Sequence, residues 1–128
     1  MENGILKDKK ILIVEDDLSS RLYLNKILEK TGAIILNAGD GQEAIDIAMN
    51  YPDIDIILMD IQLPVMDGYD SANKIREFRK DIIIIAQTAY SLLGDKEKII
   101  ASGFDDYIVK PIFPRQLIDK MAASLIRG

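Results

Sequence analysis

The sequence contains no histidine and no cysteine among its 128 residues. These absences exclude a cysteine nucleophile, a Ser-His-Asp triad, disulfides, and a zinc site built from thiolates or imidazoles. They also exclude a phosphorylated imidazole carried on this chain. Chemistry at any functional site must therefore use oxygen ligands, lysine and hydroxyl groups.

Basic clusters and long apolar runs are also missing. The 16 basic residues stand against 21 acidic ones, which gives a net charge of −5, and no stretch gathers Lys and Arg. We therefore expect neither nucleic acid nor an anionic membrane as a direct partner. The longest apolar run, residues 82–86, is far too short to span a bilayer, and the N-terminus has no apolar region of secretory length. These features predict a cytoplasmic protein without membrane insertion.

Short runs rich in Ile, Leu and Val predict five β-strands, at residues 11–14, 33–36, 54–59, 82–86 and 107–109. The first, third and fourth runs are apolar without alternation. Strands that are buried on both faces of a parallel sheet have this pattern, because helices cover both sides.

The segments between these runs carry apolar residues at helical spacing. The predicted inward-facing stripes are Leu18, Leu22, Ile27 and Leu28; Ala44, Ile45, Ala48 and Met49; Tyr69, Ala72, Ile75 and Phe78; Leu92, Leu93, Ile99 and Ile100; and Leu117, Ile118, Met121 and Leu125. The fourth helix, over residues 91–102, is predicted to be the weakest and most mobile, because Gly94 lies near its start.

Strictly alternating strands and helices predict an α/β fold with right-handed crossovers. The length fits an open doubly wound sheet better than an eightfold barrel. We expect a five-stranded parallel sheet with the common order 2-1-3-4-5 and five helices distributed over both faces. We expect a single domain over residues 1–128, with a core at about 9–126 and no output domain.

In such a sheet, ligands bind outside the carboxyl ends of the strands, where the strand order reverses. The first strand is followed by Glu15, Asp16 and Asp17, and the third by Asp60. Glu15, Asp16 and Asp60 should converge, and three neighbouring carboxylates resist ionisation unless a cation is present. Oxygen ligands favour Mg²⁺, with Mn²⁺ or Ca²⁺ as alternatives.

Thr88 and Lys110 follow the fourth and fifth strands and should face the same pocket. A hydroxyl and a compact positive charge opposite a metal suit an incoming phosphoryl group, and the Asp60 carboxylate can serve as its nucleophile. Each residue alone has an ordinary explanation: a helix cap for Asp16 or Asp17, and a surface charge for Lys110. Their combination at the strand ends favours a phosphoryl-transfer site.

At these positions the sequence resembles the receiver domains of two-component response regulators, the CheY-like superfamily, over essentially its whole length. The matching runs are ILIVEDD at 11–17, MDIQLPVMDG at 59–68, AQTA at 86–89 and DDYIVKP at 105–111. The resemblance implies a CheY-like, flavodoxin-like fold and an Asp60 that accepts a phosphoryl group from a phosphohistidine.

The resemblance also implies a metal site. Asp16 would bind Mg²⁺ directly, together with Asp60 and the backbone carbonyl of Gln62. Glu15 occupies the position of the family's first acid, which is usually Asp and typically reaches the metal through water. Its extra methylene group could alter the geometry around the metal.

The resemblance assigns phosphoryl contacts to Thr88 and Lys110, and a cis peptide to the Lys110–Pro111 bond. Tyr107 matches the aromatic residue that rotates inward when the threonine is drawn toward the phosphate. The fourth helix, fifth strand and fifth helix of the sequence-based prediction would then form the output surface, by a shift between two packing arrangements.

Because this sequence has no histidine, the phosphodonor must lie outside it, on a sensor histidine kinase, on a histidine phosphotransfer protein or on another part of a longer parent chain, unless a small acyl phosphate replaces it. The downstream protein partner is not identified by the sequence, and a monomer or a weak, phosphorylation-linked dimer is expected. The chain would be a signalling switch that promotes only its own phosphorylation and slow autodephosphorylation. It resembles the receivers of hybrid sensor kinases in the segments Gln87–Tyr90 and Lys110–Ile112, so both a stand-alone regulator and an excised receiver stay open.

Three other functions are compatible with an acidic doubly wound domain. A Mg²⁺-dependent phosphatase or hydrolase of the haloacid-dehalogenase type would have a second Asp two residues after its nucleophile, where this chain has Gln62. A nucleotide- or flavin-binding domain would have a glycine- or hydroxyl-rich loop after the first strand instead of acids. A pseudo-receiver would work without phosphorylation, although the acceptor residues are all present.

Gln62 and Tyr90 are predicted to tune dephosphorylation, because they should flank the line along which water attacks the phosphoryl group. Tyr90 is bulky, so we expect slow autodephosphorylation and a faster loss of phosphate in Tyr90→Ala. The loss can be followed as the decay of the phosphorylated mass with time. A variant that loses phosphate no faster than the parent would contradict this interpretation.

Overall fold

The computed structural model describes residues 3–89 and 93–127. Its centre is a five-stranded parallel sheet in the order β2-β1-β3-β4-β5, which confirms the predicted topology. The strands are β1 (Lys10–Val14), β2 (Ile34–Ala38), β3 (Ile56–Asp60), β4 (Ile83–Thr88) and β5 (Asp106–Val109).

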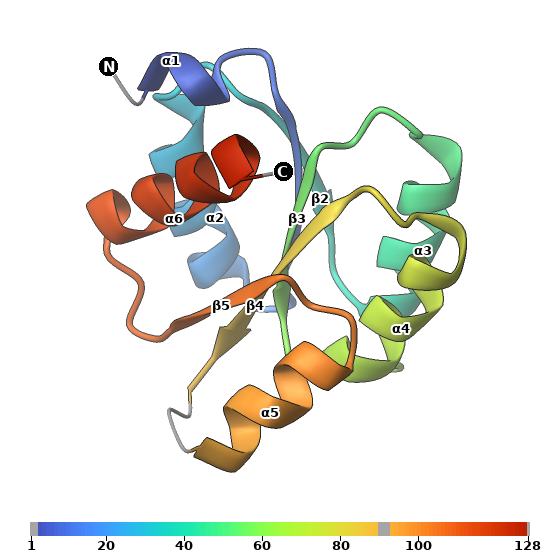
Figure 1. The fold of residues 1–128 in the computed structure, drawn as a ribbon. Coiled ribbons are helices and arrows are strands. Elements are labelled where there is room, and N and C mark those ends of the chain that lie inside the picture. The colour runs from blue at the N-terminus through green and yellow to red at the C-terminus, as the bar shows by residue number, and fades with distance from the viewer. Residues whose placement is uncertain (1–2, 90–92, 128) are drawn as a thin grey trace.

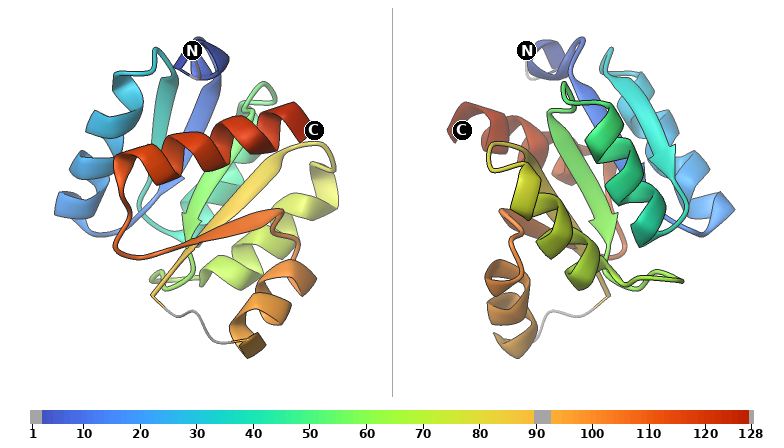
Figure 2. Two further views of the ribbon diagram at one scale, coloured as in Figure 1. Left: turned by 60° about the vertical axis from the view of Figure 1, so that its left-hand side comes forward. Right: turned by 90° about the vertical axis from the view of Figure 1, so that its right-hand side faces the viewer.

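Helices cover both faces of this sheet (Figures 1 and 2). They are α1 (Asn3–Leu6), α2 (Leu18–Glu29), α3 (Gly41–Asn50), α4 (Gly68–Phe78), α5 (Leu93–Ala101) and α6 (Pro114–Arg127). One hydrophobic core joins α3, α4 and α5 to the sheet, and a second core joins α1, α2 and α6 to the opposite face. None of the helices over the described ranges combines the length and apolar character needed to cross a membrane.

Aspartates begin three of the helices. Asp17, Asp40 and Asp67 are the N-caps of α2, α3 and α4, and each accepts a hydrogen bond from a backbone N–H three residues further on, at 2.8–2.9 Å. Such a bond satisfies a donor that the first helical turn leaves free. The ordinary interpretation of Asp17 as a helix cap is therefore correct.

The number of helices was predicted incorrectly. The described residues form six helices rather than five, because the short α1 precedes the first strand. A four-residue helix has too few positions to show periodicity. Leu6 is nevertheless fully buried in the core formed with α2 and α6, although it lies before the expected core at 9–126.

Several predicted inward-facing residues are exposed. Leu18 and Leu22 share one face of α2, but Ile27 comes nine residues after Leu18, about half a turn away, and the buried face holds Leu24, Ile27 and Leu28. The first stripe thus combined two faces of one helix. The other exposed members of the predicted stripes are Met49, Phe78 and Ile100, while Leu92 lies outside the described residues.

Gly68 allows α4 to begin directly beside the end of β3. A Cβ atom on Gly68 would lie 2.5 Å from the backbone oxygen of Asp60 and 2.7 Å from the Cα of Ile61. The backbone N–H of Gly68 also donates to the Ile61 carbonyl at 2.8 Å. The absence of a side chain at this position therefore sets how closely the helix approaches Asp60.

We expect Gly68→Ala to lower the free energy of unfolding by about 1–3 kcal/mol, because backbone atoms rather than a flexible side chain must move. Urea unfolding measures this loss. Gly4→Ala is the matched control, since nothing lies within 4 Å of a Cβ atom there. Equal stabilities of the two variants would contradict the tight approach of α4.

Candidate functional site

The predicted acidic residues meet at the carboxyl ends of β1 and β3. Asp60 is the last residue of β3, and Glu15 directly follows β1, whose Val14 pairs with Met59. Carboxylate oxygens of Glu15, Asp16 and Asp60 all lie within 4.8 Å of one another. Glu15 and Asp60 are buried, whereas Asp16 is exposed.

Backbone groups fix the two buried carboxylates. The N–H of Gln62 donates to Asp60 Oδ1 at 3.0 Å, and the N–H of Asp17 donates to Glu15 Oε2 at 3.1 Å. The guanidinium of Arg21 donates twice to the Glu15 carbonyl, at 3.0 and 3.2 Å, and so anchors the loop after β1. The other carboxylate oxygen of Glu15, Oε1, is buried without a hydrogen-bond partner among the described residues.

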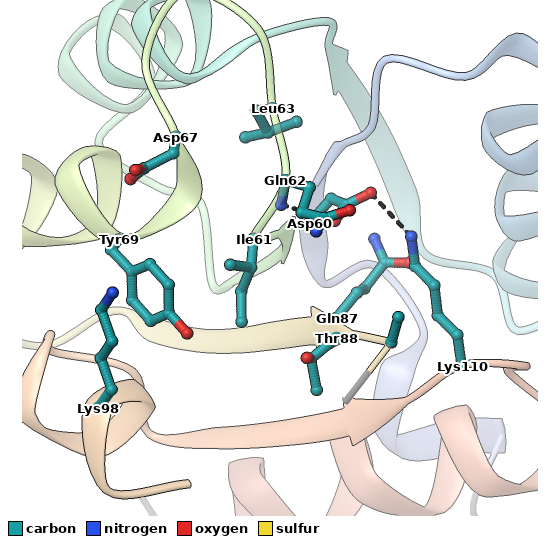
Figure 3. Close-up of a pocket in the computed structure, with 11 residues that line it drawn as sticks. Asp60, Ile61, Gln62, Leu63, Asp67, Tyr69, Gln87, Thr88, Lys98 and Lys110 are labelled. Carbon is teal, nitrogen blue, oxygen red and sulfur yellow. Dashed lines mark hydrogen bonds and ion pairs between the residues drawn. The ribbon is translucent and has the colours of Figure 1, made fainter. Parts of the chain in front are cut away.

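Lys110 supplies the positive charge beside this cluster. Its Nζ lies 2.8 Å from Asp60 Oδ2 (Figure 3). The same Nζ lies 4.0 Å from Glu15 Oε1. The backbone N–H of Lys110 donates to the backbone carbonyl of Thr88 at 2.8 Å, and this hydrogen bond holds the end of β5 against β4. The Lys110–Pro111 peptide bond is cis.

Burial and charge shift two pKa values at the site. Burial raises the pKa of the Glu15 carboxyl, and the negative charge of Asp60 adds to this, while the Asp17 N–H and the Lys110 charge oppose it. Burial lowers the pKa of Lys110, but the hydrogen bond and charge of Asp60 outweigh it, together with the charges of Glu15 and Asp16. The net effect raises the pKa of Lys110, so its amine stays protonated.

A cavity of about 540 Å³ opens in front of Asp60 (Figure 3). Thr88, Lys110 and Gln62 line it, as the sequence predicted for a site at the strand ends. Thr88 is buried at the end of β4. Asp60, Thr88 and Lys110 therefore face one space that can hold a small anionic group.

The remaining predicted residues lie elsewhere. Tyr107 is half-buried on β5 and packs against the core of α3, α4 and α5, and the Lys120 ammonium lies 5.5 Å from the centre of its ring. Tyr90 lies outside the described residues.

The lining of the cavity by Tyr69, Gln87 and Lys98 was not predicted from the sequence. Lys98 Nζ stands 4.3 Å from the centre of the Tyr69 ring, where α5 faces α4. Gln87 is the residue before Thr88, and a buried polar residue near the end of an apolar strand is a signal that the sequence did contain. The approach of Tyr69 and Lys98 depends on how two helices pack, which no local pattern shows.

This arrangement defines a class of site. A buried carboxylate can serve as nucleophile, a lysine and a threonine line the same cavity, and neighbouring acids can bind a cation that prefers oxygen ligands. Phosphoryl transfer needs these groups, because it depends on positioning and on neutralising charge. The site is suited to accept a phosphoryl group on Asp60.

The family model of the response regulator receiver domain matches residues 11–122, so the chain belongs to this family of two-component signalling domains. Hybrid signal transduction histidine kinase I of Dictyostelium discoideum is 39% identical over 127 residues, which cover 93% of this chain and 7% of that protein. The chain thus spans only a small part of this relative.

Solved structures agree with this assignment. The receiver domain of Ssk1 from Saccharomyces cerevisiae, crystallised with the histidine phosphotransfer protein Ypd1, is 34% identical with a TM-score of 0.84, covering 90% of this chain and 87% of that one. The CheX–CheY–BeF₃–Mg²⁺ complex of Borrelia burgdorferi is 30% identical with a TM-score of 0.87, covering 91% and 89%. The expected receiver fold is therefore confirmed.

Replacing Lys110 should expose the repulsion between the buried carboxylates. We expect Lys110→Met to lower the free energy of unfolding at pH 7, without metal, by about 1–2 kcal/mol; this is less than for a fully buried pair, since the lysine side chain is 37% exposed. The raised pKa of Glu15 means that folding penalises its ionised form. The penalty operates above its folded pKa and disappears as the pH falls toward the ordinary value of 4.5.

Urea unfolding at several pH values measures this effect as the stability difference between variant and parent. The difference should shrink on acidification from pH 7 toward 4.5. Lys98→Met is the matched control, because it lines the same cavity but contacts Tyr69 instead of the acids, and its effect should not depend on pH. A Lys110→Met deficit that stays constant or grows on acidification would contradict the proposed electrostatics.

Proposed function

We propose that this chain is the phosphoacceptor receiver of a two-component phosphorelay, in which Asp60 takes a phosphoryl group from a phosphohistidine. The observation that carries the proposal is the buried Asp60 carboxylate, 2.8 Å from the Lys110 amine, at a cavity that Thr88 also lines. Membership of the receiver family supports the same assignment.

We assign metal binding to the acidic cluster, with Mg²⁺ as the natural ion and Mn²⁺ as a substitute. Asp16, Asp60 and the backbone carbonyl of Gln62 would hold it, and Glu15 would reach it through water. The residues present fit such an ion, because all are oxygen donors and the buried Oε1 of Glu15 has no other partner among the described residues. A bound Mg²⁺ would neutralise charge on the phosphoryl group. The related Borrelia burgdorferi complex contains Mg²⁺.

In the transfer, a carboxylate oxygen of Asp60 forms a bond to phosphorus while the bond from phosphorus to the donor's imidazole nitrogen breaks. The electron pair of that bond stays with the imidazole, and Asp60 becomes an acyl phosphate. Lys110 exchanges part of its interaction with Asp60 for the phosphoryl oxygens, and the Thr88 hydroxyl donates to another of them. The chain itself acts as a switch, not as an enzyme with turnover of a substrate.

The donor's approach is suggested by exposed apolar residues beside the acceptor. Leu18, Leu22 and Tyr23 are about half exposed or more on α2, and Phe113 is 61% exposed in the loop before α6. The Tyr23 hydroxyl donates to the Ile112 carbonyl at 2.8 Å, which joins this helix to that loop. An apolar face next to the reactive group is suited to a partner protein. We propose that it receives the histidine kinase or histidine phosphotransfer protein.

The output surface of the proposal consists of α5, β5 and α6. Movement of Thr88 toward the phosphoryl group would open space for Tyr107, whose ring lies near Lys120 on α6. The ring position would thereby report phosphorylation to a downstream protein, or to a second copy in a weak dimer. We propose that this switch operates in the cytoplasm, as a stand-alone regulator or as part of a hybrid kinase.

The acceptor assignment is tested by intact mass spectrometry after incubation with Mg²⁺ and acetyl phosphate, or with a phosphorylated histidine phosphotransfer protein. We expect a mass increase of about 80 Da, which one phosphoryl group adds. Asp60→Asn should abolish the increase, since its amide is a poor nucleophile. Chelation of Mg²⁺ should also suppress it.

Asp81→Asn is the matched control, because its side chain is 84% exposed outside the site, and it should be phosphorylated like the parent. No mass increase with any donor would refute the acceptor assignment and favour a pseudo-receiver. Multiple turnover of a simple phosphoester, abolished in Asp60→Asn, would instead favour a phosphatase.

A further inference from the structure

Gln87 lies next to the acceptor in the sheet. The register of β3 and β4 pairs Asp60 with Gln87, and both belong to the sheet face that carries Leu58 and Ile85. Figure 3 shows the Gln87 amide pointing toward Asp60 and the Lys110 amine. Glu15, Asp60 and Gln87 thus form a row across three neighbouring strand ends.

The amide of Gln87 is buried without its full set of hydrogen bonds. The residue is 1% exposed, and its side-chain Nε2 has no hydrogen-bond partner among the described residues. A buried N–H group without an acceptor costs free energy, so such a group needs an explanation. An apolar side chain of similar size would avoid this cost.

Gln87 also separates two cavities. It lines the acceptor cavity and a smaller one of about 280 Å³ between α2 and the loop before α6, and Lys110 is the other residue common to both. The walls of the smaller cavity are mostly apolar, from Tyr23, Leu24 and Ile112. On the side of the acceptor cavity, the Gln87 amide points toward Asp60, whose Oδ2 accepts a hydrogen bond from the Lys110 amine (Figure 3).

We propose that Gln87 is a positioning residue for phosphorylation of Asp60: its side-chain N–H groups donate to the acceptor group once Lys110 has turned to the phosphoryl oxygens. This inference rests on the proposed function. Phosphorylation adds acceptor oxygens at Asp60 and draws the Lys110 amine toward them. The Gln87 amide then replaces the lost donor and keeps the aspartyl group in place, so its unused donor in the unphosphorylated protein has a purpose.

Gln87→Met tests the inference, because methionine keeps the length of the side chain and removes the donor. Without phosphoryl group or analogue, its melting temperature should equal or exceed that of the parent, since an unpaired polar group is lost. With Mg²⁺ and beryllofluoride, a phosphoryl analogue, the rise in melting temperature should be smaller than in the parent. Phosphorylation by acetyl phosphate should be slower by roughly tenfold, as expected for one hydrogen bond to a charged group.

Gln42→Met is the matched control, since this residue is exposed on α3 and does not line the acceptor cavity, and it should respond like the parent. Gln87→Leu provides a second variant if methionine disturbs packing. The inference would be overturned if either folded Gln87 variant showed the same beryllofluoride-induced rise in melting temperature and the same phosphorylation rate as the parent. This holds whatever the melting temperature of the variant is without the analogue. If the parent protein responded to neither beryllofluoride nor acetyl phosphate, the proposed function would be overturned as well. Failure of the Gln87 inference can therefore be distinguished from failure of the proposed function.

Discussion

The carboxylates of Glu15 and Asp60 are buried at neighbouring strand ends, and the ion pair between Lys110 and Asp60 makes this placement tolerable. Burial removes the Glu15 carboxylate from water, and the negative charge of Asp60 repels it. Both effects favour the protonated form of Glu15. The Lys110 amine places a positive charge against both carboxylates and also lines the cavity in which we propose that the phosphoryl group binds, so one side chain would serve both the resting protein and the reaction.

The fold provides the rigidity that this arrangement needs. Parallel pairing of β1, β3 and β4 sets Glu15, Asp60 and Gln87 side by side, and the two hydrophobic cores hold the sheet from both faces. The N–H groups of Asp17 and Gln62 then orient the carboxylates. Charges at fixed positions need no reorganisation when a charged group arrives, which is the main contribution of a protein to phosphoryl transfer.

The strand order and the convergence of Glu15, Asp16 and Asp60 could be predicted because both follow from local patterns and one topological rule. Buried parallel strands are continuous apolar runs, and ligands gather at the switch point. The buried faces of the helices were harder to predict. Leu18 and Leu22 are apolar yet exposed, because burial depends on the residue's angular position around the helix and on which elements pack against that face. The environment of Gln87 depends on three strands and a loop meeting, which the amino-acid order does not encode locally.

The proposed donor-binding face and the proposed acceptor site share structural elements in this chain. Tyr23 donates to the Ile112 carbonyl, two residues after Lys110, and Lys110 and Gln87 line both the acceptor cavity and the smaller cavity beneath Tyr23. A protein bound on Tyr23 and Phe113, as we propose for the donor, would therefore contact the loop that carries Lys110. Since the Lys110 amine lies 2.8 Å from Asp60, a small displacement of this loop would change the electrostatic environment of Asp60. In the proposed function, donor binding and the environment of the acceptor would thus be connected through one short loop.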